Sequence, residues 1–342
     1  MAAPEPPENP DLLGQNAAER TLIEAVESGR LHHGWLITGP VGVGKATLAY
    51  RFARRLLAGF QAGAESLWLE PANPVFRRVA AGGHADLRTI TRTLDAKSGR
   101  RHREILVDDV RHGVEFLHLT AIEGGWRVVI VDPAEFLNAN AANALLKILE
   151  EPPIGALVLL ISAAPGRLPA TLLSRCRMLK LSPLGDADVT ALLARFLPDV
   201  APEERSRLVA LAEGSPGRAL RLAADEGVAM AALVDEVLAG LPRFGTARAH
   251  GIADRLGRAE SGFTTFMELL LATLSSAVRA GARGRADPDQ QRLLLLRPLD
   301  AWGEVWHALS VLTDETERFS LDKRQAVISG IALLDGPLLD RP

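Results

Sequence analysis

Cysteine is almost absent from this chain, which has one, Cys176, among its 342 residues. A single thiol excludes an intramolecular disulfide framework and any zinc site built from several cysteines. Unpaired thiols are typical of reducing compartments, so we expect a cytoplasmic protein. The Cys176 side chain itself is expected to serve as a small buried hydrophobic group.

Long apolar runs and an excess of positive charge are also missing. The longest apolar stretches are about ten residues, whereas a membrane-spanning helix needs ~20. Residues 1–10 are proline-rich and acidic and lack the basic start of a signal peptide. The chain has 39 basic and 42 acidic residues, a net charge of −3 and a pI near 6.3. Proteins that grip duplex DNA usually have a pI above ~9, so any DNA contact is expected to be local or shared with partners.

What the sequence does have is an alternation of short apolar runs and helical patterns over its first 180 residues. Buried strands are expected at residues 35–38, 127–131 and 157–161, and helices follow the first two. Strands separated by helices form βαβ units and a parallel sheet that is covered on both faces. The predicted fold class is therefore α/β.

Only helical periodicity continues beyond residue 180. Helices are expected at residues 186–196, 202–213 and 218–224, with longer amphipathic helices over 228–339. The predicted domains are an α/β domain at 1–180, a small helical domain at 181–227 and a C-terminal helical domain at 228–342. One helix face of the last domain indicates a bundle core or a subunit interface and consists of Leu299, Trp302, Val305, Trp306 and Leu309.

A glycine-rich turn follows the first predicted strand and opens a helix. It matches the G-x-x-x-x-G-K core of the phosphate-binding P-loop, or Walker A motif. Glycines let successive N–H groups turn toward phosphate oxygens, and the helix N-terminus and Lys45 add positive charge. We therefore predict that these residues bind ATP. They are Gly39, Pro40, Val41, Gly42, Val43, Gly44, Lys45, Ala46 and Thr47.

Two positions lack the groups that hydrolysis needs. Ala46 stands where a Ser or Thr hydroxyl would coordinate Mg²⁺, and Thr47 points ~100° away on the helix. Asp132 ends the second predicted strand as the acidic residue of a Walker B element, but Pro133 follows where a base would polarise water. Glu135 lies two residues further on. We expect weak hydrolysis or none, with Mg²⁺ present only where a nucleotide is bound.

The sequence N-A-L-L-K-I-L-E-E-P-P at residues 143–153, together with L-L-S-R-C at 172–176, carries a family resemblance. It resembles the bacterial clamp-loader branch of the AAA+ ATPases and, within it, the delta-prime family of DNA polymerase III subunits, over most of residues 10–225. The resemblance implies a P-loop AAA+ domain, a small helical lid and a C-terminal helical collar. The related tau/gamma ATPases carry the Ser/Thr and the Asp-Glu pair that this chain lacks. They also hold zinc in a four-cysteine module, and since residues 59–103 contain no cysteine, no zinc is expected.

The resemblance also implies roles for two arginines. In the resembled family, the arginine of Ser-Arg-Cys reaches the γ-phosphate of ATP on the neighbouring subunit, and Arg175 matches it. A guanidinium suits this role because it is always charged and donates two hydrogen bonds to phosphate. The alternative is a structural arginine that caps a helix or pairs with a carboxylate. Arg218 resembles the lid arginine that contacts nucleotide, and pairing within the lid is its alternative. Residues 162–163 match the polar sensor region.

The function that the resemblance implies is that of a subunit of the replicative clamp loader. It would join tau/gamma and delta subunits in a hetero-pentamer, lend Arg175 to the next ATP site, and help to load the sliding clamp on primer–template DNA. Other subunits would carry the polymerase activity. The alternative is an AAA+ ATPase that hydrolyses ATP in its own site with Lys45, Asp132 and Glu135. A small-molecule kinase is disfavoured by the helical domains and the Ser-Arg-Cys segment.

Overall fold

In the computed structural model, a parallel sheet of five strands forms the centre of the first of two units, residues 1–219 and 220–342. The structure describes residues 3–94, 102–123, 125–257 and 261–335. The order across the sheet is β2-β3-β4-β1-β5, and all pairs are parallel. This confirms the α/β prediction. The strands are β1 (Gly34–Thr38), β2 (Leu87–Ile90), β3 (Arg127–Val131), β4 (Ala156–Ser162) and β5 (Arg177–Lys180).

The three central strands are the ones that the sequence predicts, each to within one residue at either end. The two edge strands, β2 and β5, are not predicted. Each buries a single residue, Ile90 in β2 and Leu179 in β5, and the others are exposed or half-buried. Because an edge strand is covered on fewer sides, it lacks the continuous apolar run that identifies a buried parallel strand.

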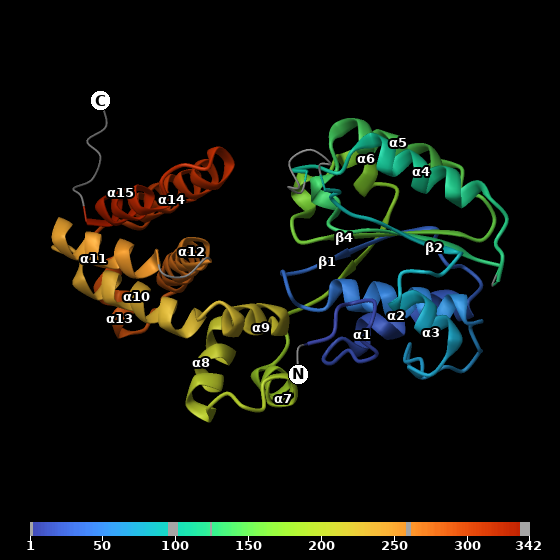
Figure 1. Ribbon diagram of the computed structural model, residues 1–342, viewed down its shortest axis with the longest axis horizontal. Helices are drawn as coiled ribbons and strands as arrows, with labels where there is room; N and C mark the ends of the chain where they lie inside the picture. The colour runs from blue at the N-terminus through green and yellow to red at the C-terminus, as the bar shows by residue number, and fades with distance from the viewer. Residues whose placement is uncertain (1–2, 95–101, 124, 258–260, 336–342) are drawn as a thin grey trace. The chain divides into compact units, whose positions relative to one another are not determined.

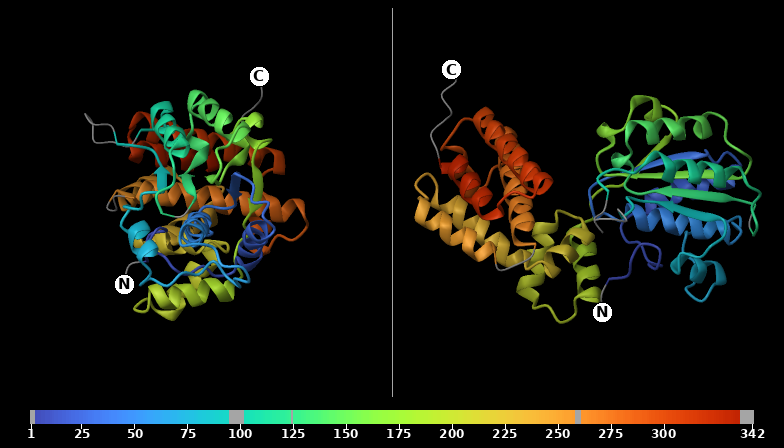
Figure 2. Two further views of the ribbon diagram at one scale, coloured as in Figure 1. Left: turned by 90° about the vertical axis from the view of Figure 1, so that its right-hand side faces the viewer. Right: turned by 45° about the horizontal axis from the view of Figure 1, so that its top comes forward.

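Helices cover both faces of this sheet (Figures 1 and 2). One face carries α1 (Asn16–Glu27), α2 (Lys45–Leu57) and α3 (Pro74–Ala80), and the other carries α4 (Val107–His118), α5 (Ala139–Glu150) and α6 (Ala170–Leu173). No helix in the described ranges combines the length and the apolar character that crossing a bilayer requires.

Helix α5 illustrates how the sequence builds this arrangement. Its first turn is capped by Asn138, whose side chain accepts a hydrogen bond from the Ala141 N–H at 2.8 Å. Leu145 and Leu149 repeat at helical spacing and are buried against the sheet. The helix ends just before Pro152, which cannot continue it. The sheet residues in the same core include Leu36, Val129, Val131, Val158 and Leu160.

Three short helices close the first unit and lead into the second. They are α7 (Asp186–Phe196), α8 (Pro202–Ala212) and α9 (Pro216–Ala224), which confirms the predicted helices of this segment. The division between the two units falls inside α9, at residues 219 and 220. The predicted domain boundaries at residues 180 and 227 stay predictions.

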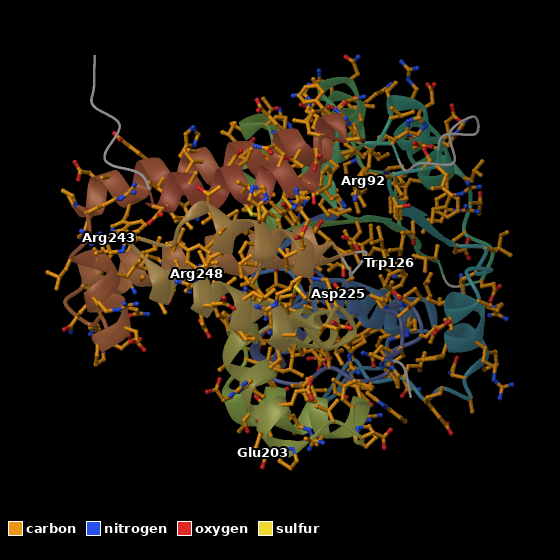
Figure 3. All side chains as sticks on the ribbon, turned by 60° about the vertical axis from the view of Figure 1, so that its left-hand side comes forward. Arg92, Trp126, Glu203, Asp225, Arg243 and Arg248 are labelled. Atoms are coloured by element: carbon orange, nitrogen blue, oxygen red, sulfur yellow. The ribbon has the colours of Figure 1, made fainter. Side chains whose placement is uncertain are left out.

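The described part of the second unit contains helices and no strand, as the sequence predicts. On the apolar face of α14, Trp302 and Leu309 are buried, whereas Trp306 keeps 38% of its surface exposed. Cation–π contacts cover some aromatic rings, and the Arg248 guanidinium lies 4.2 Å from the centre of the Phe244 ring. Arg248 is labelled among the side chains in Figure 3. The helices are α10 (Gly227–Gly240), α11 (Thr246–Leu256), α12 (Gly262–Ala282), α13 (Pro288–Leu294), α14 (Leu299–Phe319) and α15 (Lys323–Asp335).

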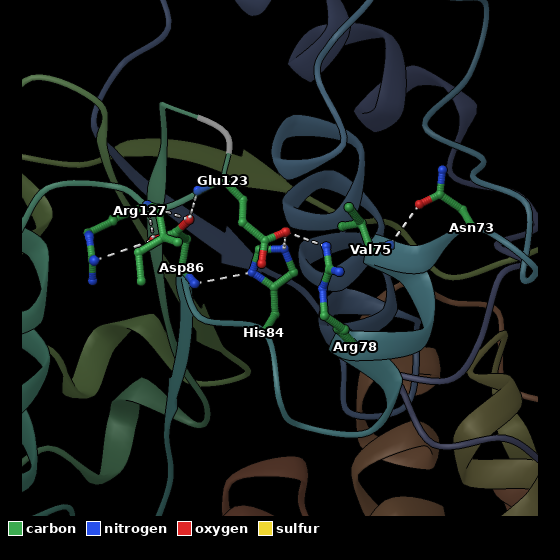
Figure 4. A network of polar contacts seen from close by, with 8 residues as sticks. Asn73, Val75, Arg78, His84, Asp86, Glu123 and Arg127 are labelled. Atoms are coloured by element: carbon green, nitrogen blue, oxygen red, sulfur yellow. Dashed lines mark hydrogen bonds and ion pairs between the residues drawn. The ribbon is translucent and has the colours of Figure 1, made fainter.

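A buried charge network stabilises the cysteine-free segment between α3 and β3 (Figure 4). Asp86 is fully buried, and its carboxylate accepts hydrogen bonds from the N–H groups of Ile122 (3.0 Å) and Glu123 (2.8 Å). The Arg127 guanidinium lies 3.4 Å from the same carboxylate and donates to the Thr120 carbonyl at 2.6 Å. A buried charge is tolerated only when it is paired in this way.

His84 extends this network toward α3. Its Nδ1 accepts a hydrogen bond from the Asp86 N–H at 3.1 Å, and its Nε2 lies 4.0 Å from the Glu123 carboxylate, which also pairs with Arg78. Burial lowers the pKa of His84, so the neutral ring is favoured. Within the described residues, no cluster of three or more His, Cys, Asp or Glu side chains is arranged to hold a metal ion.

Replacing Asp86 should therefore destabilise the first unit. Asp86→Ala removes the carboxylate that pairs with the buried Arg127 and leaves two backbone N–H groups without their acceptor, which should lower the free energy of unfolding by about 3–5 kcal/mol. Urea denaturation followed by circular dichroism measures this change. The control is Asp108→Ala, which breaks an exposed pair with Arg111 and should change stability by less than about 0.5 kcal/mol. Equal effects of the two substitutions would contradict this account.

Candidate functional site

The glycine-rich turn lies between the end of β1 and the start of α2, as predicted. Gly39, Gly42 and Gly44 have φ values of +144°, +81° and +100°, a region that favours glycine. A Cβ atom at Gly42 would lie 2.6 Å from the backbone nitrogen of Arg218. The loop therefore depends on glycine both for its curvature and for the close approach of α9.

Lys45 is the first residue of α2 and is only 8% exposed. Its ammonium group donates hydrogen bonds to the carbonyl oxygens of Gly39 (2.8 Å) and Pro40 (2.6 Å). Burial lowers the pKa of Lys45, and the nearby carboxylates of Glu135 and Asp132 oppose this shift. The charge of Lys45 therefore lies directly beneath the loop, where a phosphate-binding lysine is expected.

The acidic residues predicted for this site lie beside Lys45. Asp132 follows the end of β3 and Glu135 lies in the turn after it, and both carboxylates interact electrostatically with Lys45. Burial raises the pKa of Asp132 to about 6, an effect that Lys45 opposes and Glu135 reinforces. The Glu135 Oε1 atom accepts a hydrogen bond at 3.1 Å from the backbone N–H of Ala163, the residue that follows β4. The predicted sensor region thus contacts Glu135 through its backbone. Ser162 is buried.

The metal-coordinating hydroxyl that a P-loop normally supplies is absent at Ala46, which has only a methyl group. The next residue, Thr47, is buried in the first turn of α2. The expectation that Thr47 is a poor replacement for the missing ligand stays a prediction.

The start of α9 packs on the tip of the glycine-rich turn. The Gly217 N–H donates to the Gly42 carbonyl oxygen at 2.9 Å, and a Cβ atom at Gly217 would lie 2.8 Å from the Gly42 Cα. Arg218 thus meets the loop through its backbone, while its Nη1 atom lies 3.3 Å from the Glu213 carboxylate. The predicted contact of the Arg218 side chain with nucleotide stays a prediction.

The N-terminal segment secures the other side of the same loop. The Gln15 amide donates to the carbonyl oxygens of Ser182 (2.9 Å) and Val43 (3.4 Å). Arg51 on α2 forms a buried ion pair with Glu19 at 2.6 Å, and Arg54 donates to carbonyls of residues 7 and 9 at 2.6 Å. Sequence reasoning missed Arg51 and Arg54. Their spacing of three residues places both arginines on one face of the helix, but the sequence alone does not show which groups they bind.

Arg175 lies at the opposite end of the sheet from this loop. Its backbone carbonyl is 3.5 Å from a Cβ atom placed on Gly34, the first residue of β1, whereas the glycine-rich turn follows Thr38, the last. A strand rises about 3.3 Å per residue, which separates Gly34 from Gly39 by roughly 16 Å. The structure therefore brings Lys45, Asp132 and Glu135 together and places Arg175 away from them.

Polar contacts within the chain hold the Arg175 side chain, which is 35% exposed. Its Nη1 atom donates to the Thr171 carbonyl oxygen at 2.9 Å, and its Nη2 atom lies 2.6 Å from the Glu150 carboxylate at the end of α5. The predicted alternative of an arginine paired with a carboxylate is therefore realised within this chain. Burial raises the pKa of the adjacent Cys176 thiol to about 12, which fits its expected role as a small hydrophobic group.

Comparisons with known proteins place the first unit in context. A family model described as "DNA polymerase III, delta subunit" matches residues 14–185. Over 190 residues the chain is 41% identical to DNA polymerase III subunit delta' of Pseudomonas aeruginosa, covering 56% of this chain and 55% of that protein. It is 32% identical over 210 residues to subunit tau/gamma of Haemophilus influenzae, covering 60% and 28%. The chain thus matches about half of the delta' relative and less of the tau/gamma relative.

Among solved structures, a DNA polymerase III gamma-subunit-related protein from Thermotoga maritima aligns with 92% of this chain and 98% of its own length. The identity is 15% and the TM-score is 0.43.

The raised pKa of Asp132 predicts how stability depends on pH. Because the folded protein binds this proton more tightly than the unfolded chain does, Asp132 lowers stability as pH rises from about 4 to about 6. Asp132→Asn should therefore raise the free energy of unfolding at pH 7, on the order of 1–3 kcal/mol, and change it little at pH 4. Urea denaturation at several pH values measures the difference. An Asn variant that is no more stable at pH 7 would contradict the prediction.

Proposed function

The chain belongs to the DNA polymerase III delta subunit family, and from that premise we propose that it is a delta-prime-like subunit of a clamp loader. In this proposal it joins tau/gamma and delta subunits in a hetero-pentamer that loads the sliding clamp on primer–template DNA. It contributes Arg175 to the ATP site of a neighbouring subunit and hydrolyses ATP weakly or not at all.

The position of Arg175 is the observation that carries this proposal. Arg175 adjoins the start of β1, and the phosphate-binding loop follows the end of the same strand. An arginine at the far end of the sheet does not serve its own loop, so any phosphate that it binds belongs to another molecule. A guanidinium delivered to the γ-phosphate in this way stabilises charge in the transition state, which is worth ~10³–10⁵ in rate.

The composition of the chain's own site supports the second half of the proposal. The curved loop and Lys45 match a phosphate-binding turn, and glycine at positions 39, 42 and 44 lets neighbouring parts of the chain pack closely against it. The groups that would coordinate Mg²⁺ and polarise the attacking water are incomplete. Ala46 offers no hydroxyl, and Pro133 follows Asp132 where a base would stand. Nucleotide binding is thus compatible with the site, while metal-assisted hydrolysis lacks two of its usual groups.

A second candidate function is hydrolysis of ATP in the chain's own site. One observation favours it, namely that Glu135 and Asp132 both interact with Lys45. The Glu135 Oε2 atom is buried and makes no hydrogen bond among the described residues, so this oxygen is not committed to another group. ATP turnover by the isolated chain distinguishes this candidate from the first, since brisk turnover supports hydrolysis in its own site.

Arg175→Ala should lower the DNA-stimulated ATPase of the reconstituted assembly without preventing assembly. Turnover at the ATP site that receives the arginine should fall by ~10³ or more. The total ATPase rate of the assembly should then fall by the fraction that this site contributes. Phosphate release measures the rate, and gel filtration measures assembly. An unchanged rate in a fully assembled complex would show that Arg175 is not the finger.

Lys45→Ala should have little effect on the same ATPase, because the proposal assigns hydrolysis to other subunits. The expected change in turnover is less than about twofold, with clamp loading unchanged. A loss of turnover comparable to that of Arg175→Ala would instead identify this chain's own site as active. Circular dichroism of the Lys45 variant controls for misfolding, since Lys45 is also bonded to two loop carbonyls.

A further inference from the structure

We propose that Glu150 is a positioning residue for Arg175, which fixes the guanidinium in the orientation from which it meets a neighbouring phosphate. The inference rests on the finger role proposed above and assigns that role a second residue. It starts from the 2.6 Å ion pair between the Glu150 Oε1 and Arg175 Nη2 atoms.

Glu150 and Arg175 lie on backbone segments that differ in how firmly they are packed. Glu150 is the last residue of α5, whose preceding residues Ile148 and Leu149 are almost fully buried in the core. The Leu149 carbonyl oxygen also lies 2.7 Å from the His33 ring, which ties the end of α5 to the start of β1. Arg175 follows α6, a helix of only four residues. A side chain on a short loop is oriented best by a partner on a rigid element.

The contacts of Arg175 leave one side of its guanidinium available. Nη1 donates to the Thr171 carbonyl oxygen and, at 3.4 Å, to the Ser174 hydroxyl. Nη2 is held by the Glu150 carboxylate at 2.6 Å. Among the described residues, the Nε–H group makes no hydrogen bond, and Nη2 carries a second N–H. The Nε–H and this second N–H are the donors that remain for a phosphate, while Thr171 and Glu150 restrain the plane of the guanidinium.

Glu150 also attracts the Arg175 side chain electrostatically. The end of α5 carries the negative end of the helix dipole, and the carboxylate adds a full negative charge at the same place. Both attract Arg175, whose side chain otherwise has the rotamer freedom of a long chain. Because the pair is only partly buried, with side chains 35% and 50% exposed, it adds little to folding stability. Its effect should therefore appear in turnover.

The test compares Glu150→Gln with Glu151→Gln in the reconstituted assembly, because Glu151 is the adjacent exposed carboxylate. Glu150→Gln should lower the Arg175-dependent part of the turnover number by about two- to fivefold, with an unchanged KM for ATP. Glu151→Gln should change neither parameter. In an Arg175→Ala background, Glu150→Gln should have no further effect, since it acts only through Arg175.

Four results would overturn the inference. Turnover could be unchanged or faster with Glu150→Gln while Arg175→Ala still lowers it. That result would show that Glu150 does not position Arg175, and it would leave the proposed role of Arg175 intact. An equal loss in the Arg175→Ala background would show that Glu150 acts through the fold. Loss of assembly on gel filtration would show an interface role. No effect of Arg175→Ala would remove the finger and this inference together.

Discussion

The direction of one strand, β1, determines where the phosphate-binding loop and Arg175 lie in the first unit. Its carboxyl end delivers the glycine-rich loop, and its amino end adjoins Arg175. In a parallel sheet, all carboxyl ends meet at one edge, which is why Asp132 after β3 and Ala163 after β4 reach the same site as Lys45. Arg175 precedes β5 and so belongs to the other edge. A cation and a phosphate-binding loop on opposite edges suit a chain that acts on a neighbour.

Burial then decides what each edge can do. At the loop edge, Lys45 and Asp132 are both shifted toward their neutral forms, because desolvation outweighs their mutual attraction. The α9 helix and the N-terminal segment pack against the same loop through Gly217 and Gln15. At the opposite edge, Arg175 and Glu150 remain partly exposed. The loop end of the sheet is thus enclosed, whereas the Arg175 end is partly exposed.

Much of the fold could be predicted from the sequence, and the reasons are local. The runs at β1, β3 and β4 are continuous apolar segments, and the glycine-rich turn has a specific spacing. The edge strands β2 and β5 could not be predicted, because Arg88 and Lys180 interrupt their apolar pattern. The P-loop and strand-end motifs predict Lys45 and Asp132 in one site, and Glu135 is expected there only under the alternative of hydrolysis in the chain's own site. The Asp86–Arg127 network and the Glu150–Arg175 pair were not, since ion pairs between residues far apart in sequence leave no local pattern.

The central claim is that Arg175 acts on a nucleotide held by another subunit. The most direct measurement is a structure of the assembled clamp loader with ADP and beryllium fluoride in the tau/gamma sites. The account predicts that the Arg175 guanidinium lies within hydrogen-bond distance of the fluoride that replaces the γ-phosphate on the neighbour. An Arg175 side chain with no neighbouring nucleotide in reach would contradict it.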